Sequence, residues 1–244
     1  MSDLQPQLEH DDRDSRKAGW FVRLSARLSP GVRKVQAQIG PYARAWDEAN
    51  AAALGTAGPL WVALGDSMTQ AIGASGYDRG WVSQLQVLLY QAGSTYRVLN
   101  LSVYGARVDD VLARQLPAMR ALDNTPDLVT VLIGSNDMVN RRSRRDLLSN
   151  YGELLRQLPP GAVVASPFGN LGPGKQVNAL IAAEAADRGL RVLNNRGESN
   201  LASWKGKLAD DHFHPNDLGY AGLAEAFFQT IQESARMQER GLSG

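Results

Sequence analysis

Four short segments of the sequence carry residue types that ester chemistry requires. Ser67 lies in GDSMT, Gly105 in LSVYG, Asn136 in GSND, and Asp211 and His214 in DDHFHPN. A serine hydroxyl is a weak nucleophile at neutral pH and needs a base within hydrogen-bonding distance, usually an imidazole. An imidazole that becomes cationic needs a carboxylate to fix its tautomer, and a separation of three residues lets one turn bring the two together. These residues predict acyl transfer through Ser67, with His214 as base and Asp211 as its partner.

The tetrahedral oxyanion of such a reaction needs hydrogen-bond donors that are already in place. The backbone N–H groups of Ser67 and Gly105 and the side-chain amide of Asn136 are the expected donors. Glycine suits this role because it has no side chain to block approach and tolerates unusual backbone angles. We therefore expect an oxyanion hole formed by these three residues.

Alternating apolar runs and amphipathic stretches predict a doubly wound α/β domain that positions these residues. Loops beyond the carboxyl ends of parallel strands share one edge of the sheet. The Ser67, Gly105 and Asn136 segments follow the first three strands, and the Asp211–His214 segment follows the fifth, so all should meet there. Asn216 is the expected cap of the last helix. The expected strands are 60–64, 96–100, 128–133, 162–166 and 191–193, and the expected helices are 81–91, 108–122, 146–158, 176–188 and 217–235.

The first part of the chain has a different character. Residues 1–19 are polar and are expected to form a mobile tail. Residues 20–55 predict a basic amphipathic helical extension, with two short helices because Pro30 and Gly31 should break or kink a single one. Packing of this extension on the main domain, residues 56–240, is favoured over contact of residues 17–44 with an anionic membrane surface.

Composition excludes several classes of function. The 244 residues contain 26 Lys and Arg against 25 Asp and Glu, so the net charge of +1 does not indicate nucleic-acid binding. The absence of cysteine excludes disulfides and thiolate metal sites, and with three histidines we expect no metal and no cofactor. The N-terminus lacks the pattern of a secretory signal, and no apolar run approaches the ~18 residues of a membrane span, so a cytoplasmic enzyme is expected.

The order of these blocks, GDS with Thr69, then Gly105, then GSND, then Asp211 and His214 followed by PN, resembles that of the SGNH hydrolases. The resemblance covers roughly residues 60–235. It implies a flavodoxin-like three-layer α/β/α sandwich with a five-stranded parallel sheet. It also implies Ser67 as nucleophile and first oxyanion donor, Gly105 and Asn136 as the other donors, and Asp211 with His214 completing a triad. Met68 stands where many members of the family carry leucine, and this difference does not affect the implied catalytic chemistry.

Each residue also has a purely structural interpretation. Ser67 is a possible helix cap, and Asn136 or Asp137 a possible turn cap. His212 is the rival base, but its acidic neighbours lie one and two residues before it, which is a poorer spacing for a pair. Asp66 is expected to be structural.

Motifs of two other enzyme classes are incomplete or absent in the sequence. The segment GNLGPGK at 169–175 matches a phosphate-binding loop, but Gln176 follows where that loop needs Ser or Thr for magnesium. The Gly-x-Ser-x-Gly elbow of the α/β-hydrolases is absent because position 69 is Thr. Neither nucleotide hydrolysis nor that hydrolase fold is favoured.

The acyl acceptor is the open question. Water would make the enzyme an esterase acting on a small carbohydrate or lipid-like ester, and a sugar hydroxyl would make it an acyltransferase. An arginine cluster after the Asn136 segment could hold an anionic group such as an acyl-CoA phosphate, or could be a solvated helix face. It comprises Arg141, Arg142, Arg144 and Arg145. The alternative function is therefore transfer of a short or medium acyl chain, for example octanoyl, from acyl-CoA to a carbohydrate acceptor such as a glucosylglycerate-type glycoside.

Overall fold

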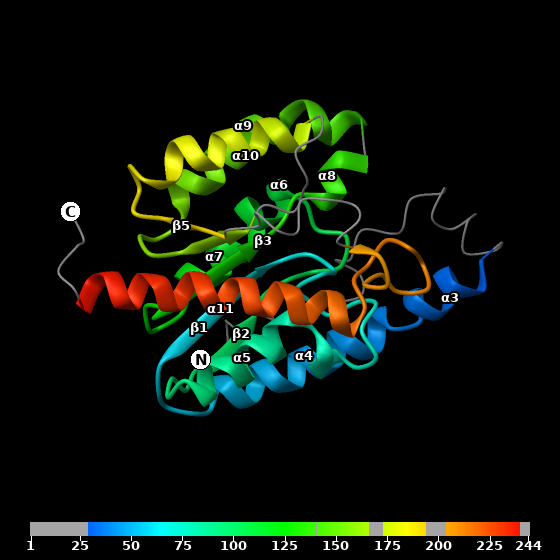
Figure 1. The fold of residues 1–244 in the computed structure, drawn as a ribbon, viewed down its shortest axis with the longest axis horizontal. Coiled ribbons are helices and arrows are strands. Elements are labelled where there is room, and N and C mark those ends of the chain that lie inside the picture. The colour runs from blue at the N-terminus through cyan, green and yellow to red at the C-terminus, as the bar shows by residue number, and fades with distance from the viewer. Residues whose placement is uncertain (1–28, 140, 166–172, 194–203, 240–244) are drawn as a thin grey trace.

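The computed structural model describes residues 29–139, 141–165, 173–193 and 204–239, and its centre is a five-stranded sheet (Figure 1). All neighbouring strands run parallel, in the order β2-β1-β3-β4-β5. The sheet confirms the predicted α/β class and the number of strands. The strands are β1 (Leu60–Gly65), β2 (Arg97–Asn100), β3 (Leu128–Leu132), β4 (Val163–Ala165) and β5 (Arg191–Val192).

The two faces of the sheet bury alternate residues of each strand. In β1, Leu60, Val62 and Leu64 pack into one hydrophobic core, and Trp61 and Ala63 pack into another. Side chains of a strand point alternately to its two faces, so a sheet covered on both sides needs apolar residues at every position. The whole of β1 is buried, as this arrangement requires.

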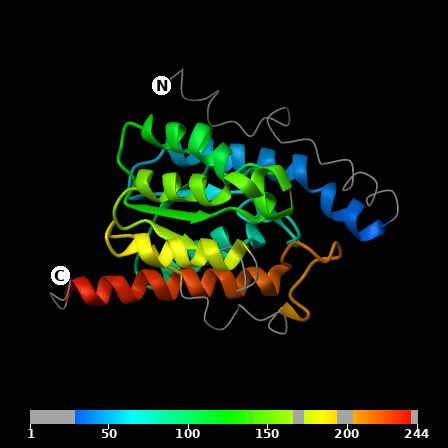
Figure 2. The ribbon, with the colours of Figure 1, turned by 90° about the horizontal axis from the view of Figure 1, so that it is seen from above.

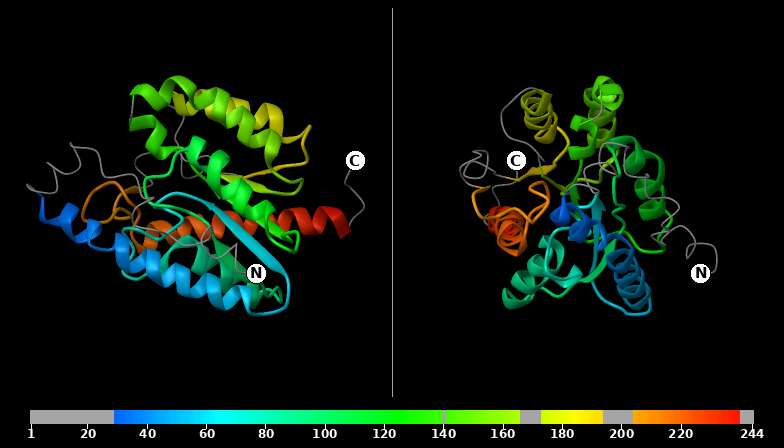
Figure 3. Two further views of the ribbon diagram at one scale, coloured as in Figure 1. Left: turned by 180° about the vertical axis from the view of Figure 1, so that it is seen from behind. Right: turned by 90° about the vertical axis from the view of Figure 1, so that its right-hand side faces the viewer.

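Helices form a layer on each face. One face is covered by α6 (Val108–Asp110), α7 (Leu116–Arg120), α9 (Arg141–Gln157) and α10 (Pro173–Ala185). The other is covered by α5 (Trp81–Gln91) and α11 (Asp217–Glu239), which join through the stacked rings of Trp81 and Phe227, 4.2 Å apart. Figure 2 and the right panel of Figure 3 show helices on both sides of the sheet, which is the predicted three-layer sandwich.

In the described residues two helices precede the sheet, and both begin at or after Pro30; the segment before Ser29, where the first of the two predicted helices would lie, is outside those residues. The helices are α3 (Pro30–Gln36) and α4 (Ile39–Leu54). Pro30 is the first residue of α3, a position where its missing N–H would have no partner in the helix. The face of α4 that includes Ala43, Trp46 and Asn50 is buried against the domain. The predicted tail 1–19 lies outside the described residues.

Other predicted boundaries need correction. Helix α9 begins five residues earlier than predicted, α10 begins at Pro173, and α11 continues to Glu239. The predicted helix 108–122 contains a π-helical turn, Val111–Gln115, between α6 and α7. Two further short elements are the single turn Tyr77–Arg79 and α8 (Ser135–Val139). Within the described chain, no helix is both long and apolar enough to cross a membrane.

Candidate active site

The turn after β1 presents Ser67. The Asp66 carboxylate accepts a hydrogen bond from the backbone N–H of Met68 at 3.0 Å, and the Ser67 carbonyl accepts one from the N–H of Ile72. Gly65 is needed for this tight path, because a β-carbon there would lie 2.2 Å from Thr69 Oγ1 and 2.5 Å from the carbonyl oxygen of Leu132. Ser67 therefore lies at the carboxyl edge of the sheet, with only 3% of its surface exposed.

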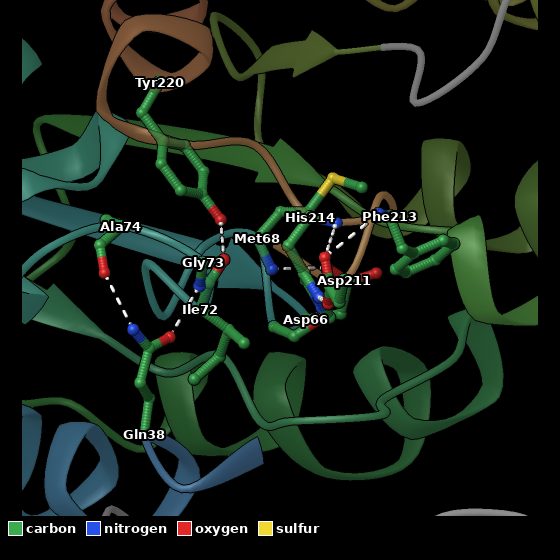
Figure 4. Close-up of polar contacts among 11 residues, drawn as sticks. Gln38, Asp66, Met68, Ile72, Gly73, Ala74, Asp211, Phe213, His214 and Tyr220 are labelled. Atoms are coloured by element: carbon green, nitrogen blue, oxygen red, sulfur yellow. Dashed lines mark hydrogen bonds and ion pairs between the residues drawn. The ribbon is translucent and has the colours of Figure 1, made fainter. Parts of the chain in front are cut away.

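Ser67, His214 and Asp211 form a chain of two hydrogen bonds. The Ser67 hydroxyl lies 2.9 Å from His214 Nε2, and His214 Nδ1 lies 2.6 Å from Asp211 Oδ2. The other Asp211 oxygen, Oδ1, accepts the backbone N–H groups of Phe213 and His214, each at 3.0 Å (Figure 4). The carboxylate is thus fixed at three points, and it fixes the imidazole in turn.

Burial and hydrogen bonding act in opposite directions on Asp211. Burial alone would raise the pKa of its carboxyl, but the hydrogen bond from His214 and the charge of that ring lower it, and the net shift is downward. The Asp211 carboxylate therefore stays ionised where the imidazole needs a negative partner. A Ser, His and Asp in this sequence of contacts have the geometry of a hydroxyl nucleophile with an oriented base.

Asn136 and Gly105 lie on neighbouring turns. Asn136 is in the first turn of α8, and its Nδ2 donates to the carbonyl of Ala106 at 2.9 Å and to Asp66 Oδ2 at 3.3 Å. Gly105 has a φ of +74°, a left-handed conformation that favours glycine. The Asn136 amide thus joins the Gly105 turn to the Ser67 turn, and the oxyanion hole formed by these three residues stays a prediction.

Asp66 connects the nucleophile turn to the Asn136 turn. Its Oδ2 accepts the Ser135 hydroxyl at 2.6 Å, in addition to the Asn136 amide. Burial raises the pKa of Asp66, although the Ser135 and Met68 hydrogen bonds oppose that change. The structural role expected for Asp66 agrees with these contacts.

Asp137 and Gln115 are buried polar residues with contacts that the sequence analysis did not predict: it named Asp137 only as a possible turn cap and did not name Gln115. Asp137 accepts the backbone N–H of Val108 at 3.2 Å, and burial raises its pKa to about 7. The Gln115 amide pairs with both backbone groups of Gly65, donating to the carbonyl at 2.8 Å and accepting the N–H at 2.9 Å. No local motif marks Gln115 or indicates the partner of Asp137, because each acts on a backbone group far away in the sequence.

The remaining predicted site residues have different positions. His212 is exposed with a φ of +56°, while His214 contacts both Ser67 and Asp211. The Arg144 guanidinium donates to the carbonyl of Met138, near the end of α8, and Arg145 is exposed. The side chains of Arg141 and Arg142 lie outside the described residues, as does most of the 169–175 motif. Binding of an anion by this cluster stays a prediction.

The sheet is parallel, has the strand order 2-1-3-4-5 and is covered by helices on both faces. It carries Ser67, Asn136 and Asp211–His214 at its carboxyl edge. This fold and this site define the class of SGNH-type hydrolases. The model of the GDSL-like lipase/acylhydrolase family matches residues 63–221, which include all of these residues. The chain belongs to this family, and the resemblance drawn from the sequence is confirmed.

Individual relatives agree with this assignment. Esterase TesA from Pseudomonas aeruginosa is 35% identical over 94 residues, which cover 38% of this chain and 45% of that esterase. A solved structure of TesA has a TM-score of 0.56 at 25% identity and covers 71% of this chain and 98% of that one. A variant of the acetyl xylan esterase Axe2 from Geobacillus stearothermophilus has a TM-score of 0.58 at 22% identity and covers 72% and 95%. The last comparison supports the fold alone.

Proposed function

We propose that this chain is a serine esterase that hydrolyses a small carbohydrate or lipid-like ester through an acyl-Ser67 intermediate. The observation that supports it most is the pair of hydrogen bonds linking Ser67, His214 and Asp211, at 2.9 and 2.6 Å. Family membership and the similarity to Esterase TesA agree with ester hydrolysis. The proposed chemistry uses this chain's own groups and invokes no metal or cofactor.

In the first half-reaction, Ser67 Oγ attacks the ester carbonyl carbon while His214 Nε2 takes the hydroxyl proton. Asp211 stabilises the imidazolium that forms. The oxyanion accepts hydrogen bonds from the N–H groups of Ser67 and Gly105 and from the Asn136 amide. Asn136 exchanges its 3.3 Å bond to Asp66 for the oxyanion, since that bond is the longer of its two. Collapse breaks the ester C–O bond, and the alcohol leaves with the proton from His214.

In the second half-reaction, water attacks the acyl-Ser67 carbonyl and gives a proton to His214. The tetrahedral intermediate uses the same donors. Its collapse releases the acid, and the proton returns to Ser67 Oγ. The base that activates each nucleophile is therefore also the acid that protonates each leaving group.

Apolar side chains beside the nucleophile favour a substrate whose acyl chain is apolar over one whose acyl chain is charged. The Phe213 ring is 42% exposed and meets the His214 ring edge-on, with centroids 4.9 Å apart. Met68 directly follows Ser67 and is half-buried against the apolar core (Figure 4). An acyl chain attached to Ser67 would gain contact with these surfaces.

Covalent labelling tests the nucleophile directly. A fluorophosphonate should form one phosphonyl ester with the parent chain, with loss of fluoride, and none with Ser67→Ala, as read by intact mass. Turnover of 4-nitrophenyl acetate should fall by about 10³-fold or more in Ser67→Ala. The matched control is Ser94→Ala, which lies at the opposite end of the strands, before β2, and should label and turn over normally. Full turnover by a folded Ser67→Ala variant would overturn the proposal.

Transfer to a sugar hydroxyl is the second candidate, favoured by the arginines at the start of α9. A labelled octanoyl-CoA offered with and without a glucosylglycerate-type glycoside separates the two functions. Release of free acid at the same rate in both reactions identifies a hydrolase. Formation of an acylated glycoside, at the expense of free acid, identifies an acyltransferase.

A further inference from the structure

Helices α3 and α4 hold two loops of the candidate active site from outside the family-matched region. Val35 of α3 packs with Ile72, from the loop after Ser67, and with Ala209, from the loop before His214. The N–H of Ala209 donates to the His214 carbonyl at 2.8 Å, and Lys34 forms an exposed ion pair with Asp210 at 2.7 Å. The extension therefore contacts both the nucleophile loop and the histidine loop.

The backbone at Gly73 lies directly against the histidine loop. A β-carbon at Gly73 would lie 2.7 Å from the β-carbon of His214 and 2.5 Å from the carbonyl oxygen of Pro215. Only a residue without a side chain permits this approach, and Gly73 also has a φ of +99°. Any shift of the Gly73 peptide would therefore be transmitted to the His214 backbone.

The loop that contains Gly73 does not have a relaxed conformation. Ala71, two residues before it, has a φ of +70°, which is uncommon for a residue with a side chain. Such a conformation persists only where surrounding contacts fix it. One of these contacts comes from α11, whose Tyr220 hydroxyl donates to the Ile72 carbonyl at 2.6 Å.

The other contacts come from the N-terminal helices. Gln38, at the start of α4, uses both ends of its amide: Oε1 accepts the N–H of Gly73 at 2.8 Å, and Nε2 donates to the carbonyl of Ala74 at 2.9 Å. The Tyr42 hydroxyl, one turn later, donates to the same carbonyl at 3.0 Å. Figure 4 shows the amide below the Gly73–Ala74 peptide, with Tyr220 on the opposite side of the loop.

We propose that Gln38 is a positioning residue for His214: its amide fixes the Gly73 peptide, and Gly73 fixes the imidazole at its distance from Ser67. This inference rests on the proposed function, which makes His214 the base. It assigns the α3–α4 extension a part in catalysis beyond covering the edge of the sheet. Gln38 does not touch the reacting atoms and acts through Gly73.

Gln38→Met tests the proposal, since methionine has a similar length and good helix propensity but cannot make either hydrogen bond. The matched control is Gln86→Met on α5, where the glutamine amide donates to the Tyr96 carbonyl at the opposite end of the strands. For 4-nitrophenyl acetate we expect Gln38→Met to lower kcat about 10- to 100-fold with little change in KM, because misplacement of a catalytic group by about 1 Å has effects of this size. Gln86→Met should keep the parent kcat.

A second readout does not depend on turnover. The His214 Nδ1 proton, in its 2.6 Å bond to Asp211, should give a far-downfield proton NMR resonance in the parent. We expect this resonance to broaden or move in Gln38→Met and to be unchanged in Gln86→Met. A residue that only stabilises the fold would lower the melting temperature without changing this resonance or kcat per folded molecule.

The outcomes separate the two proposals. A folded Gln38→Met variant with kcat within twofold of the parent and an unchanged resonance overturns the positioning role. If the parent itself neither turns over esters nor reacts with fluorophosphonate, the proposed function fails, and the resonance alone decides whether Gln38 orients His214. If Gln38→Met does not fold, Gln38→Glu, which keeps the acceptor for Gly73, and Tyr42→Phe replace it. Both should then show smaller losses of kcat, and parental kcat and resonance in both would overturn the role.

Discussion

Replacement of Asp211 by asparagine tests the tautomer of His214. The Asp211 carboxylate has acceptors on both sides: Oδ1 takes two backbone N–H groups at 3.0 Å, and Oδ2 takes His214 Nδ1 at 2.6 Å. Asparagine has an acceptor at one end of its amide and a donor at the other. If its oxygen stays with the two backbone groups, its NH2 faces Nδ1. The ring must then carry its proton on Nε2, which faces Ser67 and can no longer act as a base.

The size of the effect follows from these contacts. The productive tautomer requires the asparagine amide to flip, so that its oxygen faces Nδ1. This flip breaks the two backbone hydrogen bonds, at a cost of about 1 kcal/mol each. A cost of about 2 kcal/mol reduces the productive population roughly 30-fold. Loss of the negative charge that stabilises the imidazolium adds to this, and triads as a group show losses near 10⁴-fold. We expect kcat for 4-nitrophenyl acetate to fall about 10³- to 10⁴-fold.

The assay compares Asp211→Asn with Asp210→Asn, the neighbouring exposed carboxylate, at a temperature where both are folded by circular dichroism. Asp210→Asn loses only a surface ion pair to Lys34, an interaction worth about 0–1 kcal/mol, and should keep kcat within about threefold. A loss below tenfold in Asp211→Asn would show that Asp211 does not set the tautomer of the working base.

Two other predictions concern the surroundings of the site. Burial raises the Asp137 pKa from 3.8 to about 7, so between these pH values the folded state keeps a proton that the unfolded state loses. The free energy of unfolding should therefore fall as pH rises from about 4 to about 7, by at most about 4 kcal/mol. Asp137→Asn stays neutral, so its free energy of unfolding in urea should rise relative to that of the parent between pH 4 and pH 8. If the difference between variant and parent is the same at both pH values, the prediction is wrong. Phe213→Ala should lower kcat/KM about fivefold for octanoyl esters and hardly for acetyl esters, because only the longer chain reaches the exposed ring. Equal losses for both chain lengths would place the acyl group elsewhere.

The catalytic candidates could be predicted because each depends on local sequence and strand order. Asp211 and His214 are three residues apart and fold against one another within a single turn. Ser67 directly follows a strand whose apolar character is continuous, so its place at the carboxyl edge follows from the class of sheet. Asn216, predicted as the cap of the last helix, accepts the N–H groups of Leu218 and Gly219.

The supporting contacts could not be predicted, because they join side chains to backbone groups that are distant in sequence. Gln115 pairs with Gly65 across 50 residues, and Gln38 pairs with Gly73 across 35. A glutamine in an amphipathic helix has no pattern that indicates its partner. The spacing of apolar residues at 3.6 per turn does not indicate the π-helical turn that contains Gln115. The sequence therefore predicts one regular helix over residues 108–122. The activity, the acyl acceptor and the cytoplasmic location stay predictions.

The two glutamines have a common role that explains why the nucleophile turn needs support from both sides. Gln115 fixes the backbone just before Ser67, and Gln38 fixes it six residues after Ser67, each with one donor and one acceptor. A glutamine amide satisfies a backbone N–H and a carbonyl together and adds no charge near the buried Asp66 and Asp137. A charged residue in either position would change the field at His214 and lose one of the two hydrogen bonds to the backbone. Neutral bidentate contacts thus hold the turn while leaving Asp211 as the carboxylate that contacts the base.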